Sequence, residues 1–228
     1  MTEQATMVTL NIDGHEITVP HGTSIWDAAR TAGVEIPTLC HSSRLRPVGV
    51  CRMCVVDVGE RILAASCARV CEQGMAVLTN TQEIESHRRM LTSLLLADYP
   101  KISAREESTA DDDLLALARR YGFNSSPLSS MQDTPSTPDN SSPVILVDHS
   151  ACILCDRCVR ACDELQHNHI LGRTGKGHQT RIAFDLDQPM GESQCVACGE
   201  CAAVCPTGAL TDKMLARFRV ESLEPDTA

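Results

Sequence analysis

Two cysteine runs with the same spacing constrain this chain more than any other feature. Each run reads C-x2-C-x2-C-x3-C. The cysteines of the two runs are Cys152, Cys155, Cys158 and Cys162, then Cys195, Cys198, Cys201 and Cys205, and Pro206 follows the second run only. Three thiolates within one tight turn can cap one corner of a cubane, while a distant fourth thiolate closes it. The spacing therefore predicts two [4Fe–4S] clusters.

The pairing of the two runs predicts which sulfurs bind which cluster. In proteins with two such runs, the fourth cysteine of each run binds the cluster of the other run. The predicted ligand sets are Cys152, Cys155, Cys158 and Cys205 for the first cluster, and Cys195, Cys198, Cys201 and Cys162 for the second. We give zinc sites or disulfides little weight as explanations of these runs.

A third set of cysteines lies in the first half of the chain. Cys40, Cys51, Cys54 and Cys67 have the spacing C-x10-C-x2-C-x12-C. A [2Fe–2S] cluster needs two thiolates on each iron, and a long irregular loop lets backbone amides turn toward its sulfides. A zinc site is the alternative, but zinc favours paired C-x2-C knuckles and only one occurs here. The thirteenth cysteine, Cys71, is either an alternative ligand or a buried small apolar residue, and we favour the latter.

Composition and charge limit the class of partner. The chain has 228 residues, of which only 3% are aromatic, so its core must rely on aliphatic side chains and on other groups that hold its loops in place. The net charge of −10 excludes a nucleic-acid-binding surface and leaves protein partners and small electron carriers. The N-terminus has no signal-peptide pattern, which predicts a cytoplasmic protein. The most apolar window, 90–97, covers about two helical turns, so we expect no direct membrane insertion.

Local patterns predict an α+β fold. Residues 7–19 alternate around Asp13-Gly14, which indicates a β-hairpin, and Thr23 or Ser24 is placed to cap a following helix. Strand-like runs follow the first cysteine loop. Helices are expected over residues 82–97 and 111–121, with a polar loop between them. Later segments predict strands in PVILVD and TRIAFDL, with a hairpin turn in GRTGKGHQ.

We predict five regions from these patterns. They are a β-grasp [2Fe–2S] ferredoxin domain (1–81), a helical segment (82–123), a flexible Ser/Pro-rich linker (124–143), a two-[4Fe–4S] ferredoxin-like domain (144–215) and a C-terminal tail (216–228). The two cysteine runs of the fourth region form an internal pseudo-repeat.

The motifs resemble one known family over nearly the whole chain. TLCHSSRLRPVGVCRMCVVDV is similar to the N-terminal β-grasp ferredoxin domain of iron–sulfur subunits of respiratory complex I, NAD-linked hydrogenases and NAD-linked formate dehydrogenases. CILCDRCVRACDE and CVACGECAAVCPTGAL resemble the [4Fe–4S] domain of the same family. The resemblance implies an electron-transfer subunit with one [2Fe–2S] and two [4Fe–4S] clusters.

The chain departs from this family at one motif. Family members carry His-x3-Cys-x2-Cys-x5-Cys after the first domain, and these residues hold a further [4Fe–4S] cluster. An ungapped comparison places Tyr99, Ser103, Glu106 and Asp112 at the four positions. Hydroxyls and carboxylates are hard ligands that suit a soft iron–sulfide cluster poorly. We predict that this cluster is absent while its scaffold persists.

The sequence predicts electron transfer without a catalytic site. Each predicted cluster has four cysteines, so no iron keeps an open position for substrate, and no nicotinamide, flavin or molybdopterin pattern occurs. The expected partners are a flavoprotein that binds NAD(P) and a large catalytic oxidoreductase subunit. A soluble hydrogenase is favoured because the chain ends soon after the second run.

Three alternatives remain open. One is the iron–sulfur subunit of a split formate dehydrogenase or another complex I-related oxidoreductase. Another is an independent ferredoxin. The last is a metal-stapled interaction protein, that is, one whose fold is held together by zinc or structural clusters and which has no redox function. The sequence does not separate the hydrogenase from the formate dehydrogenase.

Overall fold

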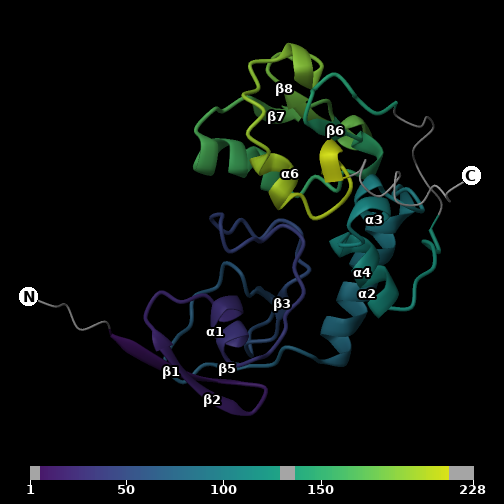
Figure 1. The fold of residues 1–228 in the computed structure, drawn as a ribbon. Coiled ribbons are helices and arrows are strands. Elements are labelled where there is room, and N and C mark those ends of the chain that lie inside the picture. The colour runs from purple at the N-terminus through teal and green to yellow at the C-terminus, as the bar shows by residue number, and fades with distance from the viewer. Residues whose placement is uncertain (1–5, 129–136, 216–228) are drawn as a thin grey trace, which may run out of the picture. The chain divides into compact units, whose positions relative to one another are not determined.

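The computed structural model describes residues 6–128 and 137–215, which fall into two compact units divided between residues 91 and 92. The first unit holds β1 (Met7–Ile12), β2 (His15–Pro20), α1 (Ile25–Thr31), β3 (Val55–Val56), β4 (Ala64–Ala65) and β5 (Ala76–Val77) (Figure 1). The helix α2 (Gln82–Ala97) crosses the division. The α+β fold predicted from the sequence is confirmed.

The first unit is built on a hairpin and one parallel strand. β1 and β2 pair antiparallel around Asp13 and Gly14, whose φ angles of 49° and 88° are those of a tight two-residue hairpin turn. β5 lies parallel to β1 on its other edge, which gives the strand order β2-β1-β5. Alternate residues of β1 are buried, and the predicted hairpin is therefore confirmed.

The helix α1 covers the buried side of this sheet. The side chain of Ser24 caps it by accepting a hydrogen bond from the amide of Asp27 at 3.1 Å, so Ser24 is the cap of the two candidates. Its buried residues share one apolar core with the inward residues of β1 and with Cys54, Cys67 and Cys71. This core fixes the loops that carry the first cysteine set.

The second unit combines short helices with two small antiparallel sheets. Its elements are α3 (Ala104–Ser108), α4 (Asp113–Arg120), β6 (Ile145–Val147), η1 (His149–Ala151), α5 (Arg157–Arg160), η2 (Ala161–Gln166), β7 (Leu171–Thr174), η3 (Gly177–Gln179), β8 (Arg181–Phe184), η4 (Met190–Glu192), α6 (Glu200–Val204) and β9 (Leu210–Asp212). β6 pairs with β9, and β7 pairs with β8 across the predicted hairpin turn. The core of this unit contains four cysteines of the two runs: Cys158, Cys162, Cys201 and Cys205.

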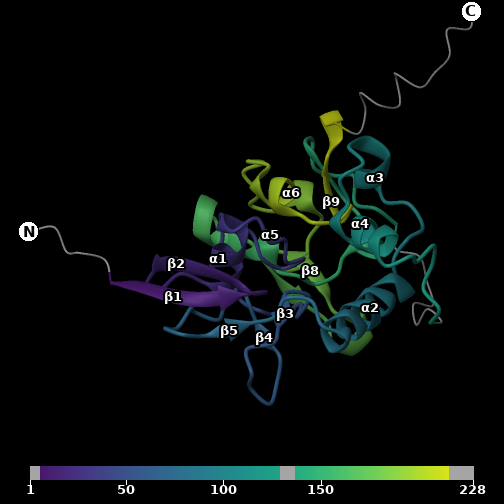
Figure 2. The same cartoon turned by 90° about the horizontal axis from the view of Figure 1, so that it is seen from below.

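The segment between α2 and α4 is more regular than the sequence suggested. Ser103 caps the one-turn helix α3 in a stretch expected to be a loop, and Asp112 caps α4 by accepting from the amide of Leu115 at 3.0 Å. Figures 1 and 2 both show α3 beside α4. A five-residue polar helix has no hydrophobic period, so sequence patterns could not reveal it.

The predicted linker lies partly outside the described residues, because residues 129–136 and the predicted tail from 216 onward are not described. On the C-terminal side of this gap, Asp139 exchanges backbone hydrogen bonds with Val147 and accepts from the amide of Met190 at 2.7 Å. The predicted region boundaries stay predictions. No helix in the described ranges is both long and apolar enough to cross a membrane.

Candidate iron–sulfur sites

Four of the five cysteines of the first unit meet as two sulfur pairs. The amide of Cys40 donates to Sγ of Cys51, and the amide of Cys51 donates to Sγ of Cys40, both at 3.4 Å. The Sγ atoms of Cys54 and Cys67 lie 3.4 Å apart, with both side chains almost fully buried. Two pairs of thiols match a cluster with two thiolates on each of two irons.

Contact within each pair perturbs the acidity of its thiols. The hydrogen bond from Cys40 lowers the pKa of Cys51 to about 5, and the same contact raises the pKa of Cys40. The hydrogen bond with Cys67 lowers the pKa of Cys54 to about 7, while the pKa of Cys67 is raised. Each pair thus contains one thiol with a lowered pKa and one with a raised pKa, and a cation such as iron can replace the protons of such thiols.

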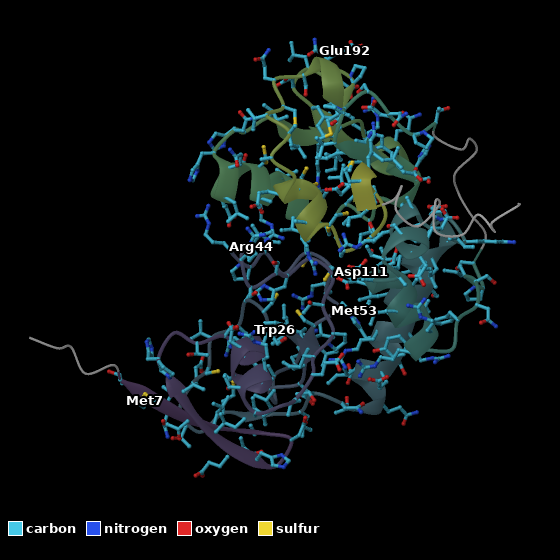
Figure 3. The ribbon with its side chains drawn as sticks, viewed as in Figure 1. Met7, Trp26, Arg44, Met53, Asp111 and Glu192 are labelled. Atoms are coloured by element: carbon cyan, nitrogen blue, oxygen red, sulfur yellow. The ribbon has the colours of Figure 1, made fainter. Side chains whose placement is uncertain are left out.

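Aromatic and imidazole rings shield the start of the first cysteine loop. His41 follows Cys40 and is buried, with its ring centroid 4.6 Å from that of Trp26 in an edge-on arrangement. Trp26 projects from α1 and donates from Nε1 to the carbonyl of Ile36 at 3.0 Å (Figure 3). This packing removes His41 from solvent.

A buried arginine supports the second sulfur pair. Arg88 on α2 is 2% exposed; its Nε donates to the carbonyl of Met53 at 3.2 Å and its Nη2 to that of Val55 at 2.9 Å. These carbonyls flank Cys54. Sequence reasoning missed this residue, although Arg88 stands four positions after the buried Ile84 and thus on the same helix face.

The thirteenth cysteine lies in the same apolar core as Cys54 and Cys67. Cys71 is 1% exposed, and burial raises the pKa of its thiol. The expected burial is confirmed, and the expectation that Cys71 is not a cluster ligand stays a prediction.

The two cysteine runs of the second unit share one backbone design. The second residue after the first cysteine is left-handed in both runs, with φ 52° at Leu154 and at Ala197, and the fourth is left-handed at Asp156 (59°) and Gly199 (82°). Such alternation turns successive amides toward one side and forms a concave site for anions. The amide of Ala197 already donates to Sγ of Cys195 at 3.4 Å. The pseudo-repeat seen in the sequence is therefore present in the backbone.

Each run encloses a small apolar cavity together with one cysteine of the other run. One cavity is lined by Cys152, Cys155, Cys158 and Cys205, with apolar walls from β6, β8 and β9. The other is lined by Cys195, Cys198, Cys201 and Cys162, with walls from β6 and β7. These groups of four have the same members as the predicted swapped ligand sets. That these sulfurs bind iron stays a prediction.

Burial makes three of these thiols reluctant to ionise without a metal. Desolvation raises the pKa of Cys152 to about 11 and the pKa values of Cys155 and Cys201 to about 12. Thiolates in such cavities need a nearby positive charge, which iron supplies. The donor set and the inward-turned amides therefore fit an iron–sulfur cluster.

Within the described ranges, no three His, Cys, Asp or Glu side chains converge on a point as ligands for one metal ion. The sulfurs are instead paired, or spread around cavities. That distribution suits clusters, in which each iron takes one or two protein thiolates. A structural zinc site would instead bring four ligands to one tetrahedral ion.

The structure brings together the four residues that replace the family's histidine and three cysteines. The hydroxyls of Tyr99 and Ser103 donate to Oδ2 of Asp112 at 2.5 and 2.6 Å, and the amide of Glu106 donates to the Ser103 hydroxyl at 3.2 Å. The Glu106 carboxylate pairs with Arg119 at 2.7 Å. Burial, followed by the charge of Asp112, raises the pKa of Tyr99. The polar groups at this site therefore bond to protein groups.

Comparisons with known proteins match both units. Residues 5–82 match the 2Fe-2S iron-sulfur cluster binding domain, and residues 142–211 match the ferredoxin-like domain of NADH-quinone oxidoreductase subunit 3. The NADP-reducing hydrogenase subunit HndD of Solidesulfovibrio fructosivorans is 36% identical over 96% of this chain and 39% of its own length. The chain is therefore related to iron–sulfur subunits of hydrogenases and of complex I.

Further relatives agree with this family. The mitochondrial 78 kDa subunit of the NADH-ubiquinone oxidoreductase of Candida albicans is 31% identical over 95% of this chain and 30% of its own length. A chain in the crystal structure of NAD+-reducing [NiFe]-hydrogenase in the H2-reduced state superposes with a TM-score of 0.81 and 28% identity, covering 97% of this chain and 90% of that chain. The chain spans 39% and 30% of the length of the two curated relatives. The resemblance predicted from its motifs is confirmed.

Proposed function

We propose that this iron–sulfur subunit relays single electrons between a flavoprotein that binds NAD(P) and a catalytic subunit of a hydrogenase. It does so with one [2Fe–2S] and two [4Fe–4S] clusters. The observation that carries the proposal is the pair of apolar cavities, each lined by three cysteines of one run and the fourth of the other. When bound, the clusters supply one-electron transfer.

The residues of the chain hold the redox groups and keep water away from them. We assign Cys40 with Cys51 to one iron of the [2Fe–2S] cluster and Cys54 with Cys67 to the other, because these sulfurs already meet as pairs. Buried apolar side chains line the two cubane cavities, and inward-turned amides offset negative charge on sulfur.

The hydrogenase assignment is favoured over the formate dehydrogenase by the comparisons. A chain of an NAD+-reducing [NiFe]-hydrogenase is matched over 90% of its length, and HndD is named as a subunit of an NADP-reducing hydrogenase. This supports a flavoprotein and a hydrogenase subunit as partners, since nicotinamide and hydrogen are the two reactants in those names.

Metal analysis of the full chain tests the cluster content. After anaerobic reconstitution we expect about ten irons and ten sulfides per chain, the sum of one two-iron and two four-iron clusters. Low-temperature electron paramagnetic resonance of the reduced protein should show both cluster types. Zinc without sulfide in the purified protein would contradict the proposal and favour the metal-stapled alternative.

A matched pair of variants tests the [2Fe–2S] ligands. Cys67→Ala and Cys71→Ala each remove one buried sulfur from the same core. We expect Cys67→Ala to lose the [2Fe–2S] signal and about two irons, and Cys71→Ala to keep both. If Cys67→Ala retains the signal as fully as Cys71→Ala does, Cys67 is not a ligand.

Swapped ligation has its own test. Cys205→Ser should damage the cubane held by the first run, and Cys162→Ser the cubane held by the second. Damage confined to the mutated run's own cubane would overturn the swap.

Anaerobic affinity purification of the tagged chain tests the partners. We expect a flavoprotein and a subunit whose activity reduces NAD(P) with hydrogen. Formate-dependent reduction without hydrogen-dependent reduction would instead support the formate dehydrogenase alternative.

A further inference from the structure

Three of the residues that replace the family's extra cluster ligands form a buried hydrogen-bonded group, which we call the Asp112 group: Tyr99, Ser103 and Asp112. Asp112 is 0% exposed and Ser103 is 1% exposed. The Asp112 carboxylate accepts from both hydroxyls through Oδ2, while Oδ1 accepts from the amide of Leu115. Three donors on one buried carboxylate compensate for its loss of water.

This group touches the segment that carries Cys205. The amide of Gly208 donates to the Tyr99 hydroxyl at 3.3 Å. A Cβ on Gly208 would lie 2.5 Å from Cβ of Ser103, so these backbones pack as closely as a glycine allows. The Asp112 group is therefore in direct contact with the chain three residues beyond Cys205.

Neighbours of the Asp112 group hold the same segment at further points. The amide of Asp113 donates to the carbonyl of Pro206 at 2.8 Å, and Nη1 of Arg105 donates to the carbonyl of Ala202 at 3.2 Å. Asp111, labelled in Figure 3, orients Arg105 through two hydrogen bonds of 2.8 and 3.0 Å. Residues 99–113 thus contact residues 202–208 on both sides of Cys205.

The path from this contact to the sulfur is short. Thr207 is 1% exposed; its hydroxyl donates to the carbonyl of Ala151 at 2.7 Å and lies 3.7 Å from Sγ of Cys205. Gly208 is the next residue. A shift of Gly208 would therefore move the Thr207 hydroxyl, which lies next to the Cys205 sulfur.

We propose that the Asp112 group is a positioning device for Cys205, so that residues at the degenerate cluster positions now fix the crossover ligand of the first cubane. The proposal rests on the proposed function, because it needs Cys205 to bind iron. Tyr99, Ser103 and Asp112 act through Cys205 and do not touch the cluster cavity, whose lining includes none of them.

Tyr99→Phe is the decisive variant, because it removes one hydroxyl and keeps the ring that packs against the core. It leaves Gly208 without its acceptor and Asp112 without one donor. Loss of a hydrogen bond to a buried charge corresponds to roughly a tenfold to hundredfold change in an equilibrium. We expect iron release to a chelator from the first cubane to rise by about tenfold or more, with a shifted potential and altered resonance signal of that cubane alone.

Two further variants make the test specific. Ser126→Ala is the control, since its hydroxyl bonds to the carbonyl of Ser93 in the same unit and not to residues 202–208. It should leave both cubanes as in the natural chain. If Tyr99→Phe fails to fold by circular dichroism, Ser103→Ala takes its place, because it removes the other hydroxyl that donates to Asp112 and should affect the same cubane.

The outcomes separate this inference from the proposed function. Cys205→Ser and Cys162→Ser mark which signal belongs to which cubane. If the natural chain binds about ten irons but Tyr99→Phe, or Ser103→Ala in its place, leaves iron release, potential and resonance signal unchanged or affects both cubanes equally, the positioning role is refuted. If the natural chain binds no iron, the proposed function itself fails.

Discussion

Replacement of Arg88 by methionine is the sharpest test of how the first unit is held together. Arg88 is buried on α2, and its guanidinium donates to the carbonyls of Met53 and Val55 on either side of Cys54. Methionine keeps most of the apolar stem and removes both donors. The variant also removes the ion pair of Arg88 with Glu85, whose atoms lie 3.4 Å apart, so it separates the polar contacts of Arg88 from the packing of its stem.

The size of the effect follows from these contacts. A hydrogen bond from a charged group contributes about 1.5–3 kcal/mol, so the loss of two bonds costs about 3–6 kcal/mol. Methionine also removes the cost of keeping a guanidinium away from water, so we expect a net loss of about 2–4 kcal/mol in the free energy of unfolding. For a unit of this size, 1 kcal/mol lowers the melting temperature by about 4–8 °C.

The assay compares two neighbouring arginines in the full chain. Arg88→Met and Arg89→Met remove the same charge one residue apart, and Arg89 is exposed. Thermal unfolding is followed by circular dichroism and by bleaching of the visible [2Fe–2S] absorption. We expect Arg88→Met to lower the bleaching midpoint by at least about 8 °C and Arg89→Met to change it little, because surface charges contribute about 0–1 kcal/mol. Equal midpoints for the two variants would refute the reasoning.

Three further predictions address other parts of the chain. Gly14→Ala should lower the free energy of unfolding by about 1–2 kcal/mol, because φ 88° at this turn is strained for any residue with a Cβ. Chemical denaturation measures this loss, and Gly22→Ser, at a similar φ of 91°, is the comparison at a glycine outside the hairpin turn. Gly208→Ala should cost about 1–3 kcal/mol or more, because its Cβ would collide with Ser103, and unchanged stability would contradict the close packing. The raised pKa of Tyr99 means that this phenol ionises at lower pH in the unfolded chain than in the folded chain. Its contribution to stability is therefore full below about pH 10 and is lost as pH rises above that value. Tyr99→Phe should remove this part of the loss of stability at alkaline pH.

Local chemistry explains which elements could be predicted from the sequence. The hairpin at Asp13-Gly14 and the helix α2 depend on neighbouring residues, so turn chemistry and periodicity were sufficient. The sequence did not predict the α3 helix, because it is too short to show a hydrophobic period. It did not predict the role of Arg88 either, because the partners of this residue lie 33 and 35 residues away.

The site at the positions of the family's extra cluster was likewise predictable only in part. An ungapped comparison of spacings located Tyr99, Ser103 and Asp112, but it could not show that their side chains would bond to one another and to Gly208. That contact spans 109 residues between Tyr99 and Gly208. Such contacts depend on the packing of α3 and α4, and no local signal encodes them.

The crossed lining of the two cavities makes each one depend on residues that are synthesised far apart in time. The first cavity includes Cys205 from the second run, and the second cavity includes Cys162 from the first. A nascent chain that ends before residue 195 therefore lacks part of each lining. Neither predicted cubane has its full set of four ligands until translation has passed the second run.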